Sequence, residues 1–207
     1  MRLTDFWSLR LTVACIIIFI LQLTIPTFTD SLALISSDIL VRPWILITSM
    51  FAHGSIEHLF YNMFALALFG TILENIIGSR RWLILYFISG IIASIAASAF
   101  YPESLGASGA IFGLLGTLAV LRPRITVWVA GIPMPMAVAA GVWAIGDLLG
   151  LFVPSGIANA AHLAGLATGI MFGIALRKKF GEPLFIKKKL AKDIDEETFR
   201  RWEREWL

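Results

Sequence analysis

The run from Gly106 to Leu121, GASGAIFGLLGTLAVL, decides which kind of fold this chain can form. It is apolar apart from Ser108 and Thr117, it repeats glycine every three or four positions, and Arg122 follows it directly. Glycines at that spacing let two helices in a membrane approach closely. The run therefore predicts a short apolar helix, with a serine at its start, packed inside a bundle of membrane helices.

The composition of the whole chain agrees with a membrane protein. Of 207 residues, 58% are apolar and 15% are charged, whereas a soluble domain has about 45–50% apolar and about 25% charged residues. A soluble domain of this length could not bury so much apolar surface. The composition also excludes a disordered chain and a collagen-like chain. A disulfide scaffold is excluded because the one cysteine, Cys15, has no partner in the chain.

Charge divides the chain into two parts. Only eight of the 132 residues from Trp44 to Ala175 are charged, but seventeen of the 31 residues from Arg177 to Leu207 are. We therefore predict a membrane domain over residues 1–177 and a charged tail over residues 178–207. The tail combines a basic cluster with aromatic residues at helical spacing, which favours an amphipathic helix at the membrane interface. A solvated tail and a helix that docks on a partner are the alternatives.

Six stretches are apolar enough to enter or cross a bilayer, which takes about 20 helical residues for a full crossing. The segment 27–55 is too long for a turn and is expected to form a long, partly membrane-embedded loop. The sequence thus predicts an all-α membrane protein built as a bundle of six transmembrane helices. The six stretches are Leu11–Pro26, Ile56–Ile77, Trp82–Phe100, Ser108–Leu121, Met134–Phe152 and Ile157–Leu176.

Lys and Arg in the loops predict the orientation of the bundle. They precede the first stretch and follow the second, fourth and sixth, whereas the other three loops hold only Arg42. Basic loops stay in the cytoplasm, so we expect both termini to be cytoplasmic. The first apolar run continues into a long loop and five further stretches, which is not typical of a cleaved signal peptide. Short loops and the lack of an organelle signal favour a prokaryotic plasma membrane.

Three polar side chains on three of the predicted helices reach nearly the same depth. Measured from the cytoplasmic end of each helix at about 1.5 Å per residue, they lie at about 21 Å for Ser108, about 22 Å for His162 and about 24 Å for Asn62. His58 lies one turn before Asn62 on the same helix face. Polar groups inside a bilayer cost several kcal/mol unless they have partners, so this cluster indicates a functional site.

A nucleophile, a base and anion-stabilising groups at one depth are typical of a hydrolytic site. Ser108 needs an adjacent base, and His162 is the only histidine at that height on another helix. Backbone amides at the start of the helix, together with Asn62 and His58, can stabilise an oxyanion. Because no acidic residue lies near His162 in the sequence, we expect a Ser–His dyad rather than a triad. Asp147 is expected to be a cap or a snorkelling group.

Other membrane chemistries lack their characteristic residues. A zinc protease needs His-Glu-x-x-His, but Glu57 and His58 stand in the opposite order and no second histidine follows four positions on. An aspartyl protease needs two aspartates and a Gly-x-Gly-Asp run, whereas Asp147 has neither. A transporter would show internal repeats, and none is clear here. We therefore expect no metal, no cofactor and no nucleic-acid partner.

Three motifs resemble those of the rhomboid intramembrane serine proteases. They are His-x-x-x-Asn from His58 to Asn62, Gly-x-Ser-Gly from Gly106 to Gly109, and Ala-His-x-x-Gly from Ala161 to Gly165. They fall in this order on the second, fourth and sixth predicted helices. The resemblance covers roughly 44–173 and differs in the first loop, where many members have Trp-Arg but Trp44 precedes Ile45.

The resemblance implies a six-helix rhomboid fold and cleavage of transmembrane proteins near the outer membrane face. It implies Ser108 as the nucleophile, His162 as the base, and His58, Asn62 and the Ser108 amide as oxyanion donors. Phe112 stands where the family often has a tyrosine stacked on the histidine.

Further implications of the resemblance concern packing and partners. Gly106 and Phe112 are expected to bind substrate or to pack the site, and His53 and Glu74 to have structural roles. The expected partners are transmembrane protein substrates and the lipid bilayer, and no oligomeric state is predicted. The alternative is a non-catalytic rhomboid-like membrane protein that binds client transmembrane helices, and a small transporter or scaffold comes third.

Overall fold

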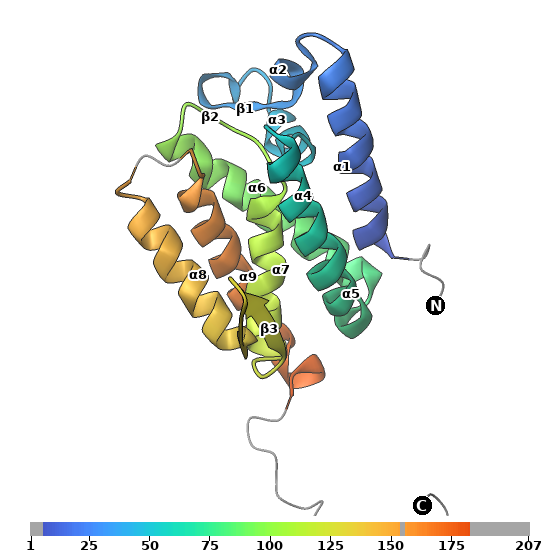
Figure 1. Cartoon of the computed structure of the whole chain (residues 1–207), viewed down its shortest axis with the longest axis vertical. Coiled ribbons are helices and arrows are strands. Elements are labelled where there is room, and N and C mark those ends of the chain that lie inside the picture. The colour runs from blue at the N-terminus through green and yellow to red at the C-terminus, as the bar shows by residue number, and fades with distance from the viewer. Residues whose placement is uncertain (1–5, 154–155, 183–207) are drawn as a thin grey trace, which may run out of the picture.

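The computed structural model describes residues 6–153 and 156–182. Within these ranges the chain is mostly helical, and its long helices stand side by side (Figure 1). The predicted tail lies outside the described residues from position 183 onwards.

Among the described residues, four helices are long and apolar enough to cross a membrane. Two others, α7 (Ser108–Leu121) and α8 (Met136–Gly150), are apolar but shorter. All six lie where the sequence predicted apolar stretches, and that all six enter the membrane stays a prediction. The four long helices are α1 (Trp7–Thr24), the continuous helix through α4 (Ile56–Ala65), the π-turn η4 (Leu66–Gly70) and α5 (Thr71–Ile77), α6 (Ser79–Phe100) and α9 (Asn159–Phe180).

Two small antiparallel sheets were omitted from the all-α prediction. Strand β1 (Leu34–Ile35) pairs with β2 (Glu103–Ser104), and β3 (Thr126–Val129) forms a hairpin with β4 (Ile132–Pro135). The hairpin turns through two residues of positive φ at positions 130 and 131, the backbone that tight hairpin turns require. Because β4 takes the residues up to 135, α8 begins two positions later than its predicted start.

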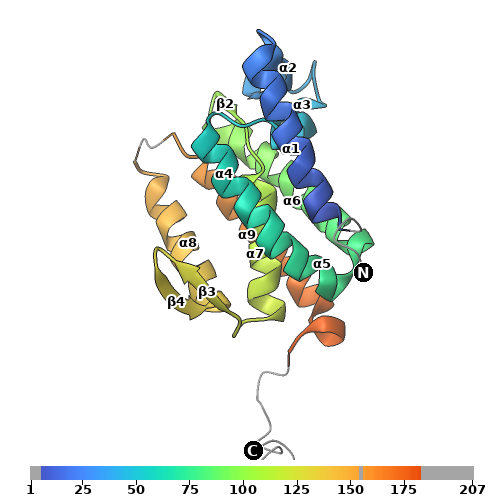
Figure 2. The same cartoon turned by 45° about the vertical axis from the view of Figure 1, so that its right-hand side comes forward.

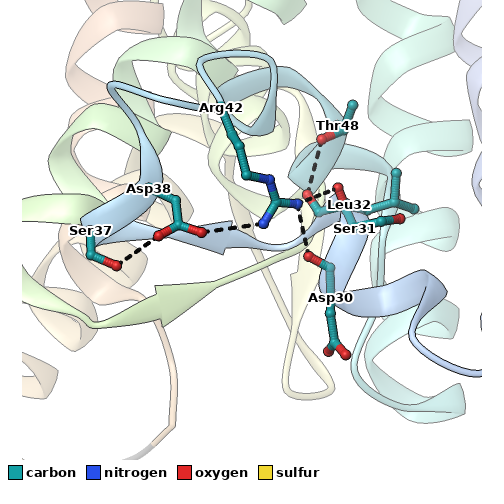
Figure 3. A network of polar contacts seen from close by, with 7 residues as sticks. All are labelled: Asp30, Ser31, Leu32, Ser37, Asp38, Arg42 and Thr48. Carbon is teal, nitrogen blue, oxygen red and sulfur yellow. Dashed lines mark hydrogen bonds and ion pairs between the residues drawn. The ribbon is translucent and has the colours of Figure 1, made fainter.

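The segment 27–55 is an ordered loop in which Arg42 contacts both residues 30–31 and Asp38 (Figure 3). The Arg42 guanidinium donates to the backbone oxygens of Asp30 at 3.0 Å and Ser31 at 2.9 Å, and it pairs with the Asp38 carboxylate at 3.3 Å. Carbonyls at the end of a helix lack partners within the helix, so Arg42 caps the short helix α2 (Phe28–Leu32). The loop also contains the 3-10 turns η2 (Ser36–Asp38) and η3 (Ser49–Phe51), and α3 (Ile45–Thr48).

Helix α7 lies in the middle of the bundle, with α4, α6, α8 and α9 around it (Figures 1 and 2). Its glycines contact those of α9 directly: a Cβ atom at Gly165 would lie 2.0 Å from the Gly109 oxygen, and one at Gly169 would lie 1.9 Å from the Gly113 oxygen. The Thr117 hydroxyl donates to the Gly169 oxygen at 2.8 Å. Only glycine permits this approach, so the glycine repeat fixes how α7 and α9 pack.

Glu74 of α5 is buried and connects the start of α1 to this helix. The amides of Trp7 and Ser8 each donate to its carboxylate at 3.0 Å, and the Ser79 hydroxyl donates at 2.6 Å. The first amides of a helix lack partners within the helix and carry partial positive charge, which a carboxylate stabilises. Glu74 therefore has a structural role, as expected.

Candidate active site

Ser108 and His162 meet at the start of two neighbouring helices. Ser108 is the first residue of α7, and His162 lies in the first turn of α9. The Nε2 atom of His162 lies 2.8 Å from the Oγ atom of Ser108. This distance is within the range over which a base takes a proton from a serine hydroxyl.

The glycine contact between α7 and α9 explains why the two side chains meet. Gly109 directly follows Ser108, and Gly165 lies three residues after His162. The two glycines touch without an intervening side chain. A contact one turn or less from each polar residue therefore sets the distance between the serine and the histidine.

Phe112 fixes the plane of the histidine ring. The two rings are stacked, with centroids 4.2 Å apart and planes 6° from parallel. Trp143 of α8 packs edge-on against Phe112, at 6.4 Å between centroids. The imidazole is therefore held on one face by an aromatic ring that carries no hydroxyl group.

Asp147 occupies a position that the sequence analysis did not predict. Its Oδ1 atom lies 2.9 Å from Nδ1 of His162, and the residue is only 8% exposed. The expectation that Asp147 caps a helix or snorkels is wrong, and so is the expectation that His162 lacks an acidic partner. The two residues lie 15 positions apart on the adjoining ends of α8 and α9, which the sequence does not place face to face. An ionisable residue in an apolar helix was the one signal available.

Asn62 and His58 lie near the site, and their role as oxyanion donors stays a prediction. The Asn62 amide donates to the His58 backbone oxygen at 2.8 Å, one turn earlier in the same helix. The Nδ1 atom of His58 accepts from the Gly54 amide at 3.4 Å. Within residues 6–153 and 156–182, the buried Oδ1 atom of Asn62 has no hydrogen-bond partner. Asn62 does line the same cavity as Ser108.

Gly106 lets the chain pass directly beside the His58 ring. Its φ of +125° is one that side chains rarely allow, and a Cβ atom there would lie 2.8 Å from two atoms of that ring. The Gly106 amide donates to the Ser49 oxygen at 2.9 Å. Gly106 therefore sets the entry of the chain into α7 and hence the position of Ser108.

His53 supports this region from the loop before α4. Its ring packs edge-on against His58, at 5.2 Å between centroids, and Gln22 binds both its backbone amide and its backbone oxygen. Burial, and secondly the nearby His58, lower the pKa of His53 from 6.5 to about 4. The ring therefore stays neutral at physiological pH and acts as a packing group.

A cavity of about 510 Å³ opens beside Ser108. Its walls come from α4, η4 and α5 on one side and from α7 on another, and Trp143 of α8 contributes to it. At the end away from Ser108, the chain from Ile125 into the β3–β4 hairpin lines it, including Trp128. Because the lining is almost entirely apolar, the cavity suits an apolar segment whose polar backbone reaches Ser108.

The described part of the chain offers no cluster of three or more His, Cys, Asp or Glu side chains that could hold a metal ion. Its polar side chains instead form a series of contacts, from the Ser108 hydroxyl through the His162 imidazole to the Asp147 carboxylate.

Comparison with known proteins places these features in one family. The family model described as the rhomboid domain matches residues 41–179. RHOMBOID-like protein 6, mitochondrial, of Arabidopsis thaliana is 37% identical over 64% of this chain and 43% of its own length. The protein named rhomboid protease GluP of Bacillus subtilis (strain 168) is 37% identical over 64% of this chain and 26% of its own length. Rhomboid protein 1, mitochondrial, of Saccharomyces cerevisiae is 32% identical over 73% of this chain and 47% of its own length.

This chain thus spans less than half the length of these three curated relatives. The relatives include mitochondrial and bacterial proteins, so they do not favour a prokaryotic plasma membrane over an organelle membrane. The apolar helices and the domain match agree on an integral membrane protein of a group that includes named proteases. The resemblance carried by the three motifs is therefore confirmed, and this chain belongs to the rhomboid family.

Proposed function

We propose that this chain is an intramembrane serine endopeptidase in which Ser108 is the nucleophile and His162 is the general base. The observation that carries the proposal is the 2.8 Å contact between His162 Nε2 and Ser108 Oγ, at the start of an apolar helix and beside an apolar cavity. The substrate is a transmembrane protein whose chain unwinds near the outer membrane face. Its apolar part would occupy the cavity.

In the proposed reaction, the Ser108 oxygen attacks the scissile carbonyl while its proton passes to His162 Nε2. The developing oxyanion takes donors from the Ser108 amide, which lies at a helix start, and from Asn62 and His58. One N–H of the Asn62 amide donates to the His58 backbone oxygen, and its second N–H is the donor for the oxyanion. His162 then protonates the leaving amine, and water releases the acyl group.

The same proposal includes the topology. All six apolar helices lie in the membrane, and both termini face the cytoplasm, which the distribution of Lys and Arg supports. The start of α1 and the end of α9 point to the same end of the bundle in Figure 1, as this topology requires. The membrane domain covers residues 1–177, and the charged tail covers residues 178–207. On this topology Ser108 faces the outer side.

Cleavage of a transmembrane substrate in liposomes tests the proposal. Ser108→Ala and His162→Ala should each lower kcat by a factor of about 10³ or more, and the double variant should lose little more, because the two residues act as a unit. Ser98→Ala is the matched control, since within the described residues the Ser98 hydroxyl donates to Ile95 of its own helix and makes no other hydrogen bond. Cleavage that persists in Ser108→Ala would overturn the assignment.

A non-catalytic protein that binds client transmembrane helices is the second candidate function. The apolar cavity favours it, because such a cavity can hold a helix with or without cleavage. In that case the wild type would bind transmembrane segments but cleave none of several substrates, and Ser108→Ala would bind them equally well.

A further inference from the structure

We propose that Asp147 is a positioning residue of this site, which holds His162 in the tautomer and orientation that activate Ser108. The inference rests on the proposed function and extends it, because the sequence had indicated only a serine and a histidine. It is carried by the 2.9 Å contact between Asp147 Oδ1 and His162 Nδ1, on the side of the ring opposite Ser108.

The two contacts of the imidazole define which nitrogen carries the proton. A neutral histidine has one N–H donor and one acceptor nitrogen. A carboxylate can only accept, so Nδ1 must donate to Asp147, and Nε2 is left as the acceptor that faces the Ser108 hydroxyl. This is the tautomer that a general base requires. In the opposite tautomer, Nε2 would carry the hydrogen and could not accept the proton of Ser108.

The environment of Asp147 strengthens the contact. The Asp147 and His162 side chains are only 9% and 12% exposed, so water screens their interaction weakly. When His162 takes the serine proton, its ring becomes positive beside the carboxylate, which stabilises that charge. Phe112 lies flat against the ring and prevents it from turning away from Asp147.

Few other charged groups act on the histidine. Helix α4 contributes His58, which interacts electrostatically with His162. Helix α7 faces the ring with Ser108, which carries no charge. The basic residues of α6 lie at the other end of the bundle, where Arg81 packs on Phe180. Within the part of the chain that the structure describes, Asp147 supplies the one carboxylate in contact with His162. A change in the pH dependence on removing it can therefore be assigned to this contact.

A merely structural role for Asp147 predicts a different result from a positioning role. If the carboxylate only satisfied a buried imidazole, an isosteric amide would lower the melting temperature and leave turnover of the folded protein unchanged. If it positions the base, turnover falls while substrate binding is retained.

The experiment measures kcat, KM and the pH–rate profile of the full chain in liposomes, with the transmembrane substrate used above. Asp147→Asn should lower kcat by about 10²- to 10⁴-fold with KM changed less than about threefold. Its pH–rate profile should differ from that of the wild type, because no carboxylate faces the imidazole ring. Asp147→Glu should restore the profile and part of kcat. Asp30→Asn is the matched control, since Arg42 binds the Asp30 backbone oxygen and not its carboxylate.

Nitrogen NMR of histidine-labelled protein in lipid gives a second readout that does not depend on activity. His162 in the wild type should carry its proton on Nδ1, and Asp147→Asn should shift the population toward Nε2–H. The signal is assigned with His162→Ala. A His162 that carries its proton on Nε2 in the wild type overturns the inference, whether or not any substrate is cleaved.

The outcomes separate this inference from the proposed function. An Asp147→Asn protein that matches the wild type in kcat and pH profile overturns the positioning role and leaves the protease proposal intact. A wild type whose Ser108→Ala variant cleaves equally well overturns the protease proposal, and the NMR measurement still decides whether Asp147 sets the tautomer.

Discussion

Buried polar residues acquire their roles here from neighbours on other helices. Asp147 lies in an apolar helix and has no polar neighbour in the sequence that would explain it. In the folded chain it contacts His162, which in turn contacts Ser108. Glu74 is equally buried but caps a helix start. Two acidic residues in apolar helices thus have different roles, and the contacts of each carboxylate distinguish them.

The lowered pKa of His53 leads to a prediction about the stability of the protein in acid. Its pKa is about 4 in the folded protein, below the ordinary 6.5, so the unfolded chain binds a proton more readily between these values. Stability should therefore fall as pH drops from about 6.5 toward 4, with a loss of about 2 kcal/mol at pH 5. His53→Gln should flatten this fall in melting temperatures measured in detergent at pH 7 and pH 5. An equally steep fall in the variant would assign the acid sensitivity to other groups.

At the level of elements, the contact between α7 and α9 sets the geometry of the proposed site. Gly109 and Gly165 bring the two helix starts together, and Ser108 and His162 follow from that contact. Glycine costs helix stability through backbone entropy, so the repeat is useful only where the helices need close approach. The position where α7 starts matters as well, because the first amides of the helix, from Ser108 onwards, lack partners within the helix.

Gly165→Ala should separate the two helices. Its new methyl carbon would lie 2.0 Å from the Gly109 oxygen, which forces a backbone shift beside the reacting groups. A displacement of about 1 Å can lower turnover about 10²-fold, so we expect a loss of that size together with a lower melting temperature.

Gly141→Ala is the matched control, since it places a methyl group on α8 where no atom of the described residues lies within 4 Å. That variant should keep its turnover and gain about 0.5–1 kcal/mol of stability. Equal turnover in both variants would contradict the role given to the glycine contact.

At the scale of the whole molecule, the two ends of the bundle are built differently. The loop segment 27–55 and the β1–β2 sheet lie at the end of the bundle from which α7 starts, and the β3–β4 hairpin lies at the other end (Figures 1 and 2). The cavity connects the two, from Ser108 to the hairpin. In a membrane, an apolar segment in this cavity would be bounded at one end by the polar side chains around Ser108 and at the other end by the hairpin.

Labelling of single cysteines tests the proposed topology. In a Cys15→Ser background, Leu40→Cys should react with a membrane-impermeant maleimide added to intact cells, because Leu40 is 96% exposed in the loop assigned to the outer side. Gly131→Cys in the hairpin turn should react only after the membrane is permeabilised. The reverse pattern would place both termini outside and contradict the assignment drawn from loop charge.

Local pattern was enough to predict the six apolar helices, the serine at the start of α7 and its histidine partner. Helix rise and hydrophobic runs are properties of consecutive residues, so depth could be counted along each helix. The bounds of the helix over 56–77 and of α7 were predicted without error. The glycine repeat also indicated close packing before its partner helix was known.

The contacts across the bundle depended on tertiary packing. The approach of Asp147 to His162, the capping of α2 by Arg42 and the turn of the Asn62 amide toward its own helix each join groups whose distance the sequence does not fix. The β3–β4 hairpin forms where a loop was expected. Which of these contacts form depends on how the helices rotate and cross, because a side chain in a membrane bundle takes its partner from whichever helix packs against that face.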